Sequence, residues 1–273
     1  MYPNQILLGL TAYDLCLCIA VGACFYIFSV YADKLKIAAK NQTFTVICGI
    51  FAVVLGYGSA VLFQAFYNIK TRGEFIIDAS TGATFYGGLI GGAAVFLAIY
   101  FLAGHFRFKE GSHKAYFFPI ANCVAPGIAL AHAIGRVGCL FAGCCHGQAT
   151  KAWYGIMMHG NQGYQKYVPT QLMEAIFLLL LFGFLTVRVL WQKGKVYNLS
   201  SYLVFYGIWR FFVENLRADY RGDTVVEWLT PSQLTALLLI AVGIALVFVE
   251  KYVTDRVPAP AVPKAEEKKN EKA

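Results

Sequence analysis

Two histidines, an arginine and three cysteines fall within sixteen residues of this sequence, HAIGRVGCLFAGCCHG at 132–147, inside an otherwise apolar region. Ionisable side chains in an apolar segment are costly, so they are functional-site hypotheses by default. At helical spacing, a single stripe would carry His132, Arg136, Cys139, Gly143 and Gly147. A buried guanidinium without a partner is very expensive. Arg136 therefore requires either an acid from another segment or an anionic ligand, and a phosphate suits its planar fork of donors.

The elements that must position these groups are apolar runs. The chain has 273 residues, of which 58% are hydrophobic and 14% are charged, whereas about a quarter of a soluble domain is charged. Runs that are long enough, or nearly so, to cross about 30 Å of hydrocarbon lie at 12–31, 44–66, 84–104, 116–143, 170–190, 199–216 and 232–250. We therefore predict an all-α fold, a polytopic membrane helix bundle of about seven transmembrane helices. The sixth run is short, and the fourth contains Pro119 and Pro126, so we expect it to be kinked or to begin at the membrane interface.

The basic residues predict the orientation of this bundle. Fifteen of the 23 Lys and Arg fall in the alternate loops near residues 34–40, 107–114 and 188–195 and in the C-terminal tail, and six fall in the other loops. The positive-inside rule therefore puts the N-terminus outside and the C-terminus in the cytoplasm. We predict one membrane domain at 1–255 and a disordered cytoplasmic tail at 256–273. Because the positive charge is spread between apolar runs, we expect no nucleic-acid partner.

In this orientation, polar groups from several runs share one depth, in the outer half of the membrane. They are Tyr13, Asp14, Tyr86, Arg136, Glu174, Arg210 and Glu214, with Cys144, Cys145 and His146 at the outer mouth. Scattered structural polar groups would have no reason to gather in this way. The glycines of YGGLIGG, 86–92, favour close helix packing. Alternatively, they form a flat surface that a lipid head group or acyl chain approaches.

Together, these residues match the sequence pattern of a known family. The chain resembles the prolipoprotein diacylglyceryl transferases, whose signature G-R-x-G-N-F-x-N-G-E-x-x-G aligns with GRVGCLFAGCCHG at 135–147. Further matches are AYDLCLCIAVG in the first run, FYGGLIGG in the third, PTQLMEA opening the fifth, YGIWRFFVENLR in the sixth and SQLTALLLIAVG in the last. The resemblance covers nearly the whole chain in order.

The resemblance also implies site residues. As catalytic residues we expect Tyr86, Arg136, Arg210, Glu214 and Cys144 at positions of the family's motifs, together with His146, which stands at no family position. As substrate-binding residues the resemblance suggests Tyr13, Gly87, Gly88, Arg136, Cys139, Gly147 and Arg210. The family's histidine before G-G-L is Tyr86 here, its signature asparagines are Cys139 and Ala142, and its signature glutamate is Cys144. Tyrosine has a pKa near 10 and is a weak base at neutral pH, so His146 or His132 would have to substitute.

The resemblance implies an enzyme of lipoprotein biosynthesis in the bacterial plasma (inner) membrane, multi-pass, with an active site that faces outward. It would transfer the diacylglyceryl group from phosphatidylglycerol, or from another anionic phospholipid, to the lipobox cysteine thiol of a prolipoprotein signal peptide. The thiol must become a thiolate to act as the nucleophile, and cations must stabilise the departing phosphate. Arg136 and Arg210 fit the second need. We expect no cofactor and no metal.

The three cysteines of 139–145 leave alternatives open. They are small neutral replacements, or they form a membrane thiol or redox enzyme on the same fold in which Cys139, Cys144 and Cys145 react. A metal site with Cys and His ligands is a third interpretation, although the spacing is unlike common zinc motifs. An inactive lipid-binding paralogue is a further alternative. Because Gly143 and Gly147 are expected to end the helix, we predict that Cys144 is accessible from outside, with a lowered pKa, and that Cys144 and His146 turn back toward Arg136.

Overall fold

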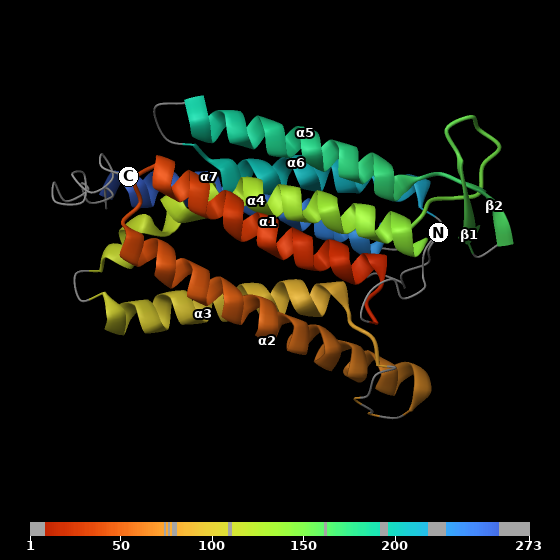
Figure 1. Ribbon diagram of the computed structural model, residues 1–273, viewed down its shortest axis with the longest axis horizontal. Helices are drawn as coiled ribbons and strands as arrows, with labels where there is room; N and C mark the ends of the chain where they lie inside the picture. The colour runs from red at the N-terminus through yellow and green to blue at the C-terminus, as the bar shows by residue number, and fades with distance from the viewer. Residues whose placement is uncertain are drawn as a thin grey trace. The chain divides into compact units, whose positions relative to one another are not determined.

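Helices account for most of the chain in the computed structural model, which describes residues 9–73, 75, 77, 81–108, 111–160, 163–191, 196–217 and 228–256. The helices are α1 (Ala12–Lys34), α2 (Ala39–Arg72), α3 (Phe85–Arg107), α4 (Ser112–Ala142), α5 (Thr170–Trp191), α6 (Asn198–Val213) and α7 (Pro231–Arg256) (Figure 1). A 3-10 turn, η1 (Glu214–Leu216), continues α6. Each predicted apolar run is therefore a helix. The predicted disordered tail lies, beyond Arg256, outside the described residues.

Six of these helices are long and apolar enough to cross a membrane: α1 to α5 and α7. Helix α6 has 16 residues, which at about 1.5 Å per residue is shorter than the roughly 30 Å of a bilayer core. The predicted polytopic helical membrane fold is confirmed, and the crossing of α6 stays a prediction. The fourth run forms one helix that contains both Pro119 and Pro126.

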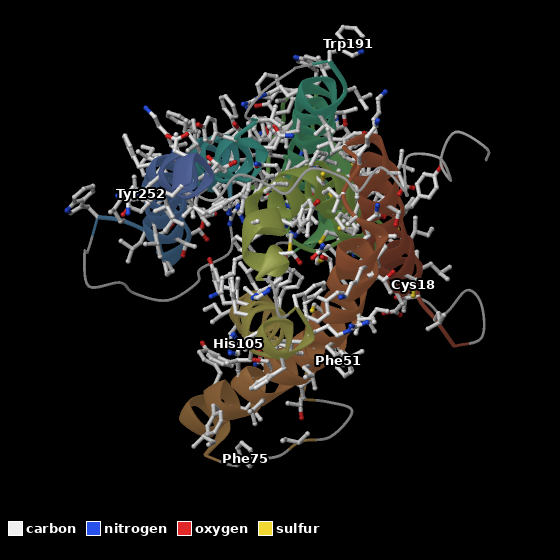
Figure 2. All side chains as sticks on the ribbon, turned by 90° about the vertical axis from the view of Figure 1, so that its left-hand side faces the viewer. Cys18, Phe51, Phe75, His105, Trp191 and Tyr252 are labelled. Carbon is white, nitrogen blue, oxygen red and sulfur yellow. The ribbon has the colours of Figure 1, made fainter. Side chains whose placement is uncertain are left out.

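The outward faces of the helices are apolar. Large hydrophobic side chains project away from the backbone, including Phe51 with 50% of its surface exposed, Trp191 with 79% and Tyr252 with 56% (Figure 2). A soluble monomer rarely exposes contiguous apolar surface on this scale. The same side chains suit a hydrocarbon environment, in which an apolar face needs no protein cover.

The chain divides into two compact units. The first contains residues 1–35 and 121–256, and the second contains residues 36–120 and 257–273, so the division falls within α4, directly after Ile120. In the first unit, α6 packs along α7 and also against α5. Helix α1 approaches α4 so closely that a Cβ atom on Gly127 would lie 2.9 Å from the carbonyl oxygen of Cys24. Small residues thus allow close helix contact in this unit.

In the second unit, α2 and α3 pack side by side (Figure 1). Glycines make the contact possible, because a Cβ atom on Gly56 would lie 3.0 Å from Cα of Gly92, and one on Gly87 would lie 2.6 Å from Cβ of Phe63. The close-packing interpretation of YGGLIGG is therefore confirmed.

A β-hairpin is the element that sequence analysis missed. Strands β1 (Ile156–Gly160) and β2 (Gly163–Tyr167) pair antiparallel between α4 and α5, with Ile156 opposite Tyr167 and Gly160 opposite Gly163. The predicted helical fold holds, and this short hairpin is an element that it did not include. The two glycines of GNQG at the turn are the signal that could have found it.

Candidate functional site

The signature segment ends α4 in a defined capping geometry. Helix α4 stops at Ala142, and Gly143 follows in the left-handed region with φ of 70°. The N–H of Gly143 donates to the carbonyl of Leu140 over 3.2 Å, and the N–H of Cys144 donates to the carbonyl of Cys139 over 3.2 Å. This pair of bonds is a Schellman motif. The prediction that a glycine ends the helix here is confirmed.

Arg136 has the acidic partner that its burial required. Its Nη2 lies 3.1 Å from Oε1 of Glu174, which belongs to α5 and is fully buried. The hydroxyl of Tyr206 on α6 donates to the same oxygen over 2.8 Å. His132 lies one turn before Arg136, with Nε2 3.8 Å from this carboxylate and Nδ1 3.0 Å from the hydroxyl of Tyr202. Three helices thus converge on one buried carboxylate.

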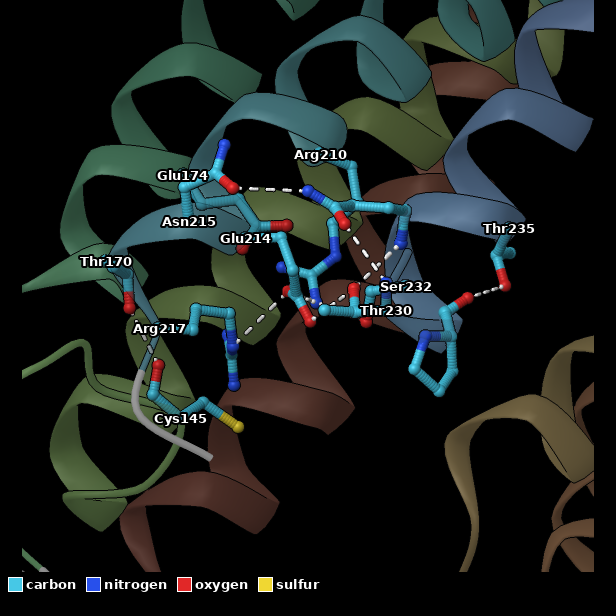
Figure 3. Close-up of polar contacts among 12 residues, drawn as sticks. Cys145, Thr170, Glu174, Arg210, Glu214, Asn215, Arg217, Thr230, Ser232 and Thr235 are labelled. Atoms are coloured by element: carbon cyan, nitrogen blue, oxygen red, sulfur yellow. Dashed lines mark hydrogen bonds and ion pairs between the residues drawn. The ribbon is translucent and has the colours of Figure 1, made fainter. Parts of the chain in front are cut away.

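A second arginine–carboxylate pair joins α6, η1 and the start of α7. Nη2 of Arg210 lies 2.7 Å from Oε2 of Glu214 and donates to the hydroxyl of Ser232 over 3.0 Å (Figure 3). The hydroxyl of Thr230 reaches Oε1 of Glu214 over 3.4 Å, and Nε of Arg217 lies 3.8 Å from Oε2. The i,i+4 ion pair of Arg210 with Glu214 thus lies within a larger network.

Among the described residues, each of these two arginines has a buried nitrogen donor without a hydrogen-bond acceptor. The two donors are Nε of Arg136 and Nη1 of Arg210. A buried polar atom that lacks a partner carries a desolvation cost of about 1–3 kcal/mol or more. An anionic ligand that brought acceptor oxygens to these donors would remove that cost.

The thiols of Cys139, Cys144 and Cys145, called the thiol cluster below, meet just beyond this point. Their three Sγ atoms all lie within 4.8 Å of one another. The first turn of α5 fixes the backbone beneath them. The hydroxyl of Thr170 donates to the carbonyl of Cys145 over 2.9 Å (Figure 3). The side-chain amide of Gln171 donates to the carbonyl of Cys144 over 2.7 Å.

The charge of the thiol cluster centres on Cys145. The pKa of its thiol lies below the ordinary value, because hydrogen bonding with Cys139 and Cys144 favours its thiolate and because Arg217 and Arg136 supply positive charge nearby. The pKa of Cys144 is raised: its hydrogen bond with Cys139 lowers it, but the bond with Cys145 and burial raise it more. Cys144 is exposed, as predicted. The sequence predicted a lowered pKa for Cys144, which is wrong; the pKa of Cys145 is lowered instead.

His146 and Gly147 belong to the hairpin side of this segment. The ring of His146 lies 4.3 Å from that of Tyr167, its Nδ1 lies 2.9 Å from the carbonyl oxygen of Gly147, and the thiol cluster includes no atom of it. His146 therefore packs on the hairpin rather than turning back toward Arg136. A Cβ atom on Gly147 would lie 2.5 Å from the carbonyl oxygen of Leu216 and 2.8 Å from Cβ of Val168. Only glycine fits this position without displacing its neighbours.

Tyr13 lies beside the signature segment. A Cβ atom on Gly138 would lie 3.2 Å from Cδ2 of Tyr13 and 3.0 Å from Cβ of Cys16. The ring therefore covers the helix two residues beyond Arg136. Asp14 has a structural role instead, because its carboxylate accepts from the N–H and the hydroxyl of Thr11 in a capping box at the start of α1.

The remaining candidates lie in the second unit. Tyr86, Gly87 and Gly88 occupy the first turn of α3. A Cβ atom on Gly88 would lie 3.3 Å from Cβ of Ala60 on α2. The space beside Gly87 is likewise occupied, by the side chain of Phe63. Both glycines thus serve helix packing within their unit. Substrate binding by Gly87 and Gly88, and a catalytic role for Tyr86, stay predictions.

Several members of the Arg136–Glu174 and Arg210–Glu214 networks were not predicted from the sequence. Glu174 was noted as a buried acid, but not as the partner of Arg136, and Tyr206, Ser232 and Arg217 were given no role. The sequence did contain signals: an arginine that needs an acid, and an arginine three residues after Glu214. It contained no signal for which of the helices would supply the partner.

The comparisons with known proteins point to a single family. The family described as "Prolipoprotein diacylglyceryl transferase" matches residues 4–249. A relative in Clostridium tetani, named "Phosphatidylglycerol--prolipoprotein diacylglyceryl transferase", is 32% identical over 211 residues, which are 76% of this chain and 79% of the relative. A second transferase of that name in Clostridium perfringens is 37% identical over 184 residues, which are 64% of each chain. A relative of the same name in Streptococcus uberis is 28% identical over 252 residues, covering 88% of this chain and 90% of its own length.

Proposed function

Because the chain belongs to the prolipoprotein diacylglyceryl transferase family, we propose that it moves the diacylglyceryl group of phosphatidylglycerol to the lipobox cysteine in the signal peptide of a prolipoprotein. The family and the names of the relatives make it a transferase of lipoprotein biosynthesis. They do not favour the thiol or redox enzyme, nor the inactive lipid-binding paralogue.

The reaction makes one bond and breaks one. The acceptor thiol loses its proton, and its sulfur attacks the diacylglyceryl carbon that bears the phosphate oxygen. A thioether bond forms, the carbon–oxygen bond breaks, and glycerol phosphate leaves with the electron pair. Negative charge therefore grows on the phosphate, and fixed cations that face it lower the barrier.

One observation carries the proposal: the two buried arginines that each keep an unpaired donor, Nε of Arg136 and Nη1 of Arg210. Each arginine is oriented by a carboxylate, at 3.1 Å from Glu174 and 2.7 Å from Glu214. A guanidinium that is held in this way presents its remaining N–H groups in a fixed direction. We assign both arginines to the phosphate of the lipid, with Glu214 positioning Arg210.

The other candidates have narrower roles in this proposal. Tyr13 lies beside Gly138, and Cys139 follows Arg136 by three residues on α4, so we propose that Tyr13 and Cys139 contact the lipid. Tyr86, with Gly87 and Gly88, stands where the family has its histidine, and its part in the reaction stays a prediction. Gly147 supports the site by its close packing on Val168. Catalytic roles for Cys144 and His146 stay predictions, which Cys144→Ser and His146→Gln test through activity.

We further propose that the enzyme lies in the bacterial plasma membrane with this site facing outward. The uneven distribution of Lys and Arg between alternate loops supports that orientation. The signature turn and the hairpin then lie on the outer side, where exported prolipoproteins arrive.

The test is complementation of a bacterial strain that is depleted of its own diacylglyceryl transferase. Wild-type protein should restore growth and lipidation of a reporter prolipoprotein. Arg136→Lys and Arg210→Lys should each lower the transfer rate in membranes by about 100-fold, the usual effect of removing one aimed donor, because an ammonium cannot reproduce the guanidinium fork.

The matched control is Arg107→Lys, which changes an exposed arginine at the end of α3, outside both networks. It should retain wild-type transfer. Full activity in both Arg136→Lys and Arg210→Lys would overturn the phosphate assignment, and failure of the wild type to lipidate the reporter would overturn the proposed reaction.

A further inference from the structure

The thiol cluster has the spacing of a metal-binding site. The Sγ atoms of Cys139, Cys144 and Cys145 lie within 4.8 Å of one another. Three thiolates around one ion, with bonds of about 2.3 Å, lie about 3.8–4.0 Å apart. The thiols are therefore within about one ångström of the spacing that a shared ion requires, a gap that side-chain rotation can close.

The backbone brings these thiols together without a ligand. After α4 ends, Gly143 and Cys145 both adopt left-handed conformations, with φ of 70° and 62°. A left-handed conformation is uncommon for a residue other than glycine and persists where the surroundings impose it. Here Thr170 and Gln171 impose it, by hydrogen bonds to the carbonyls of Cys145 and Cys144. The cluster is thus built by the fold rather than assembled by chance side-chain contact.

The donor atoms define the class of ion. Within the part of the chain that the structure describes, this group of converging ligand atoms consists of sulfur alone. Thiolates select soft ions, Cu(I) and Zn(II) among them, over magnesium, calcium or manganese. Three sulfurs satisfy trigonal Cu(I), or leave one tetrahedral position of Zn(II) for water.

We propose that Cys139, Cys144 and Cys145 bind one thiophilic ion, Zn(II) or Cu(I), through three thiolate sulfurs. Each thiol that still carries a proton releases it to solvent on binding. Arg217 and Arg136 supply positive charge to this place, which offsets the negative charge of a trithiolate complex. The sequence spacing did not suggest a zinc motif, because the third ligand reaches the ion through the left-handed turn rather than along the helix. The inference does not rest on the transferase reaction.

The test uses the full-length protein, reduced and purified in detergent without oxygen. Zn(II) is titrated in competition with a chromogenic chelator, and Cu(I) in a separate arm with a Cu(I)-specific chelator. One ion per chain in at least one arm is expected, and X-ray absorption of that complex should show sulfur ligands at about 2.3 Å. Binding weaker than that of free cysteine in both arms, or a coordination sphere without sulfur, would overturn the proposal.

Variants assign the site. Cys139→Ser, Cys144→Ser and Cys145→Ser should each weaken binding by about tenfold or more, within the range known for altered metal sites. Cys18→Ser removes an exposed thiol of α1 outside the cluster and should leave binding unchanged. Equal binding by all four variants would refute the site.

A measurement on the wild type keeps the test valid if a variant does not fold. Mass spectrometry after brief alkylation should show the three cluster thiols protected by the bound ion, while Cys18 is modified to the same extent with and without it. Loss of the protection on adding the chelator should follow. Alkylation of the cluster that is unaffected by the ion would count against the proposal as directly as unaltered variants.

Discussion

At the residue scale, Arg136 and Glu174 are buried as an ion pair, with Nη2 of Arg136 3.1 Å from Oε1 of Glu174. Each charge offsets the desolvation free energy of the other. Glu174→Gln leaves the guanidinium uncompensated, and losing one partner of a buried pair costs about 3–5 kcal/mol. We expect the free energy of unfolding in detergent to fall by that order. The double variant Arg136→Met, Glu174→Gln should lose less than the two single variants together. Strict additivity would show that the pair contributes no coupling.

The thiol of Cys145 gives a second prediction at this scale. Its lowered pKa means that it remains a thiolate at a lower pH than free cysteine, whose pKa is about 8.5. The alkylation rate of Cys145 should therefore hold its plateau as pH falls through neutrality, whereas that of free cysteine declines. The measurement is the rate at each pH, followed by peptide mass spectrometry.

Variants test the cause of this shift. Arg217→Gln removes one nearby positive charge and should move the profile toward higher pH, while Arg107→Gln on α3 should leave it unchanged. A Cys145 profile that coincides with that of free cysteine would contradict the lowered pKa.

At the scale of elements, the end of α4 depends on the handedness of one residue. Gly143 has φ of 70°, and a side chain in that conformation costs about 1–2 kcal/mol. Gly143→Ala should lower the free energy of unfolding by this amount and disperse the thiol cluster, which slower alkylation of Cys145 would report.

Gly135→Ala is the matched control. A Cβ atom there would meet nothing within 4 Å, and alanine within a helix is favoured over glycine by about 0.5–1 kcal/mol. It should leave the protein as stable or more so. Similar destabilisation by both substitutions would mean that the turn is not the cause.

The helices of this protein were predictable because the length of each apolar run indicates a helix, and each of the seven runs is a helix. The capping role of Gly143 was also predictable, because it depends on residues within one turn. The ion pair of Arg210 with Glu214 is local in the same sense, since its partners are four residues apart. The partner of Arg136 was not local: Glu174 is 38 positions away, on a helix whose rotation no spacing rule fixes. The hairpin was missed because two five-residue strands carry little hydrophobic signal. His146 was misplaced because its position depends on that hairpin.

At the scale of the whole molecule, orientation in the membrane is open to direct test. The distribution of Lys and Arg predicts that Trp153, which is 90% exposed after α4, faces outside and that Lys36, between α1 and α2, faces the cytoplasm. In intact cells, a charged maleimide should label Trp153→Cys and not Lys36→Cys, both made in a background without reactive native thiols. Labelling of position 36 from outside would reverse the topology.

The pairing of each arginine with a glutamate has a consequence for turnover. Arg136 with Glu174, and Arg210 with Glu214, each pair a positive with a negative charge before any lipid enters. On the proposed assignment, a phosphodiester gains hydrogen bonds from Nε of Arg136 and Nη1 of Arg210 without meeting two unpaired cations, which in a medium of low polarity would hold it very strongly. Glycerol phosphate carries more negative charge than the lipid that it came from. In the proposed site, Glu174 and Glu214 would repel this product, so the acids that fix the arginines would also keep the product from becoming an inhibitor.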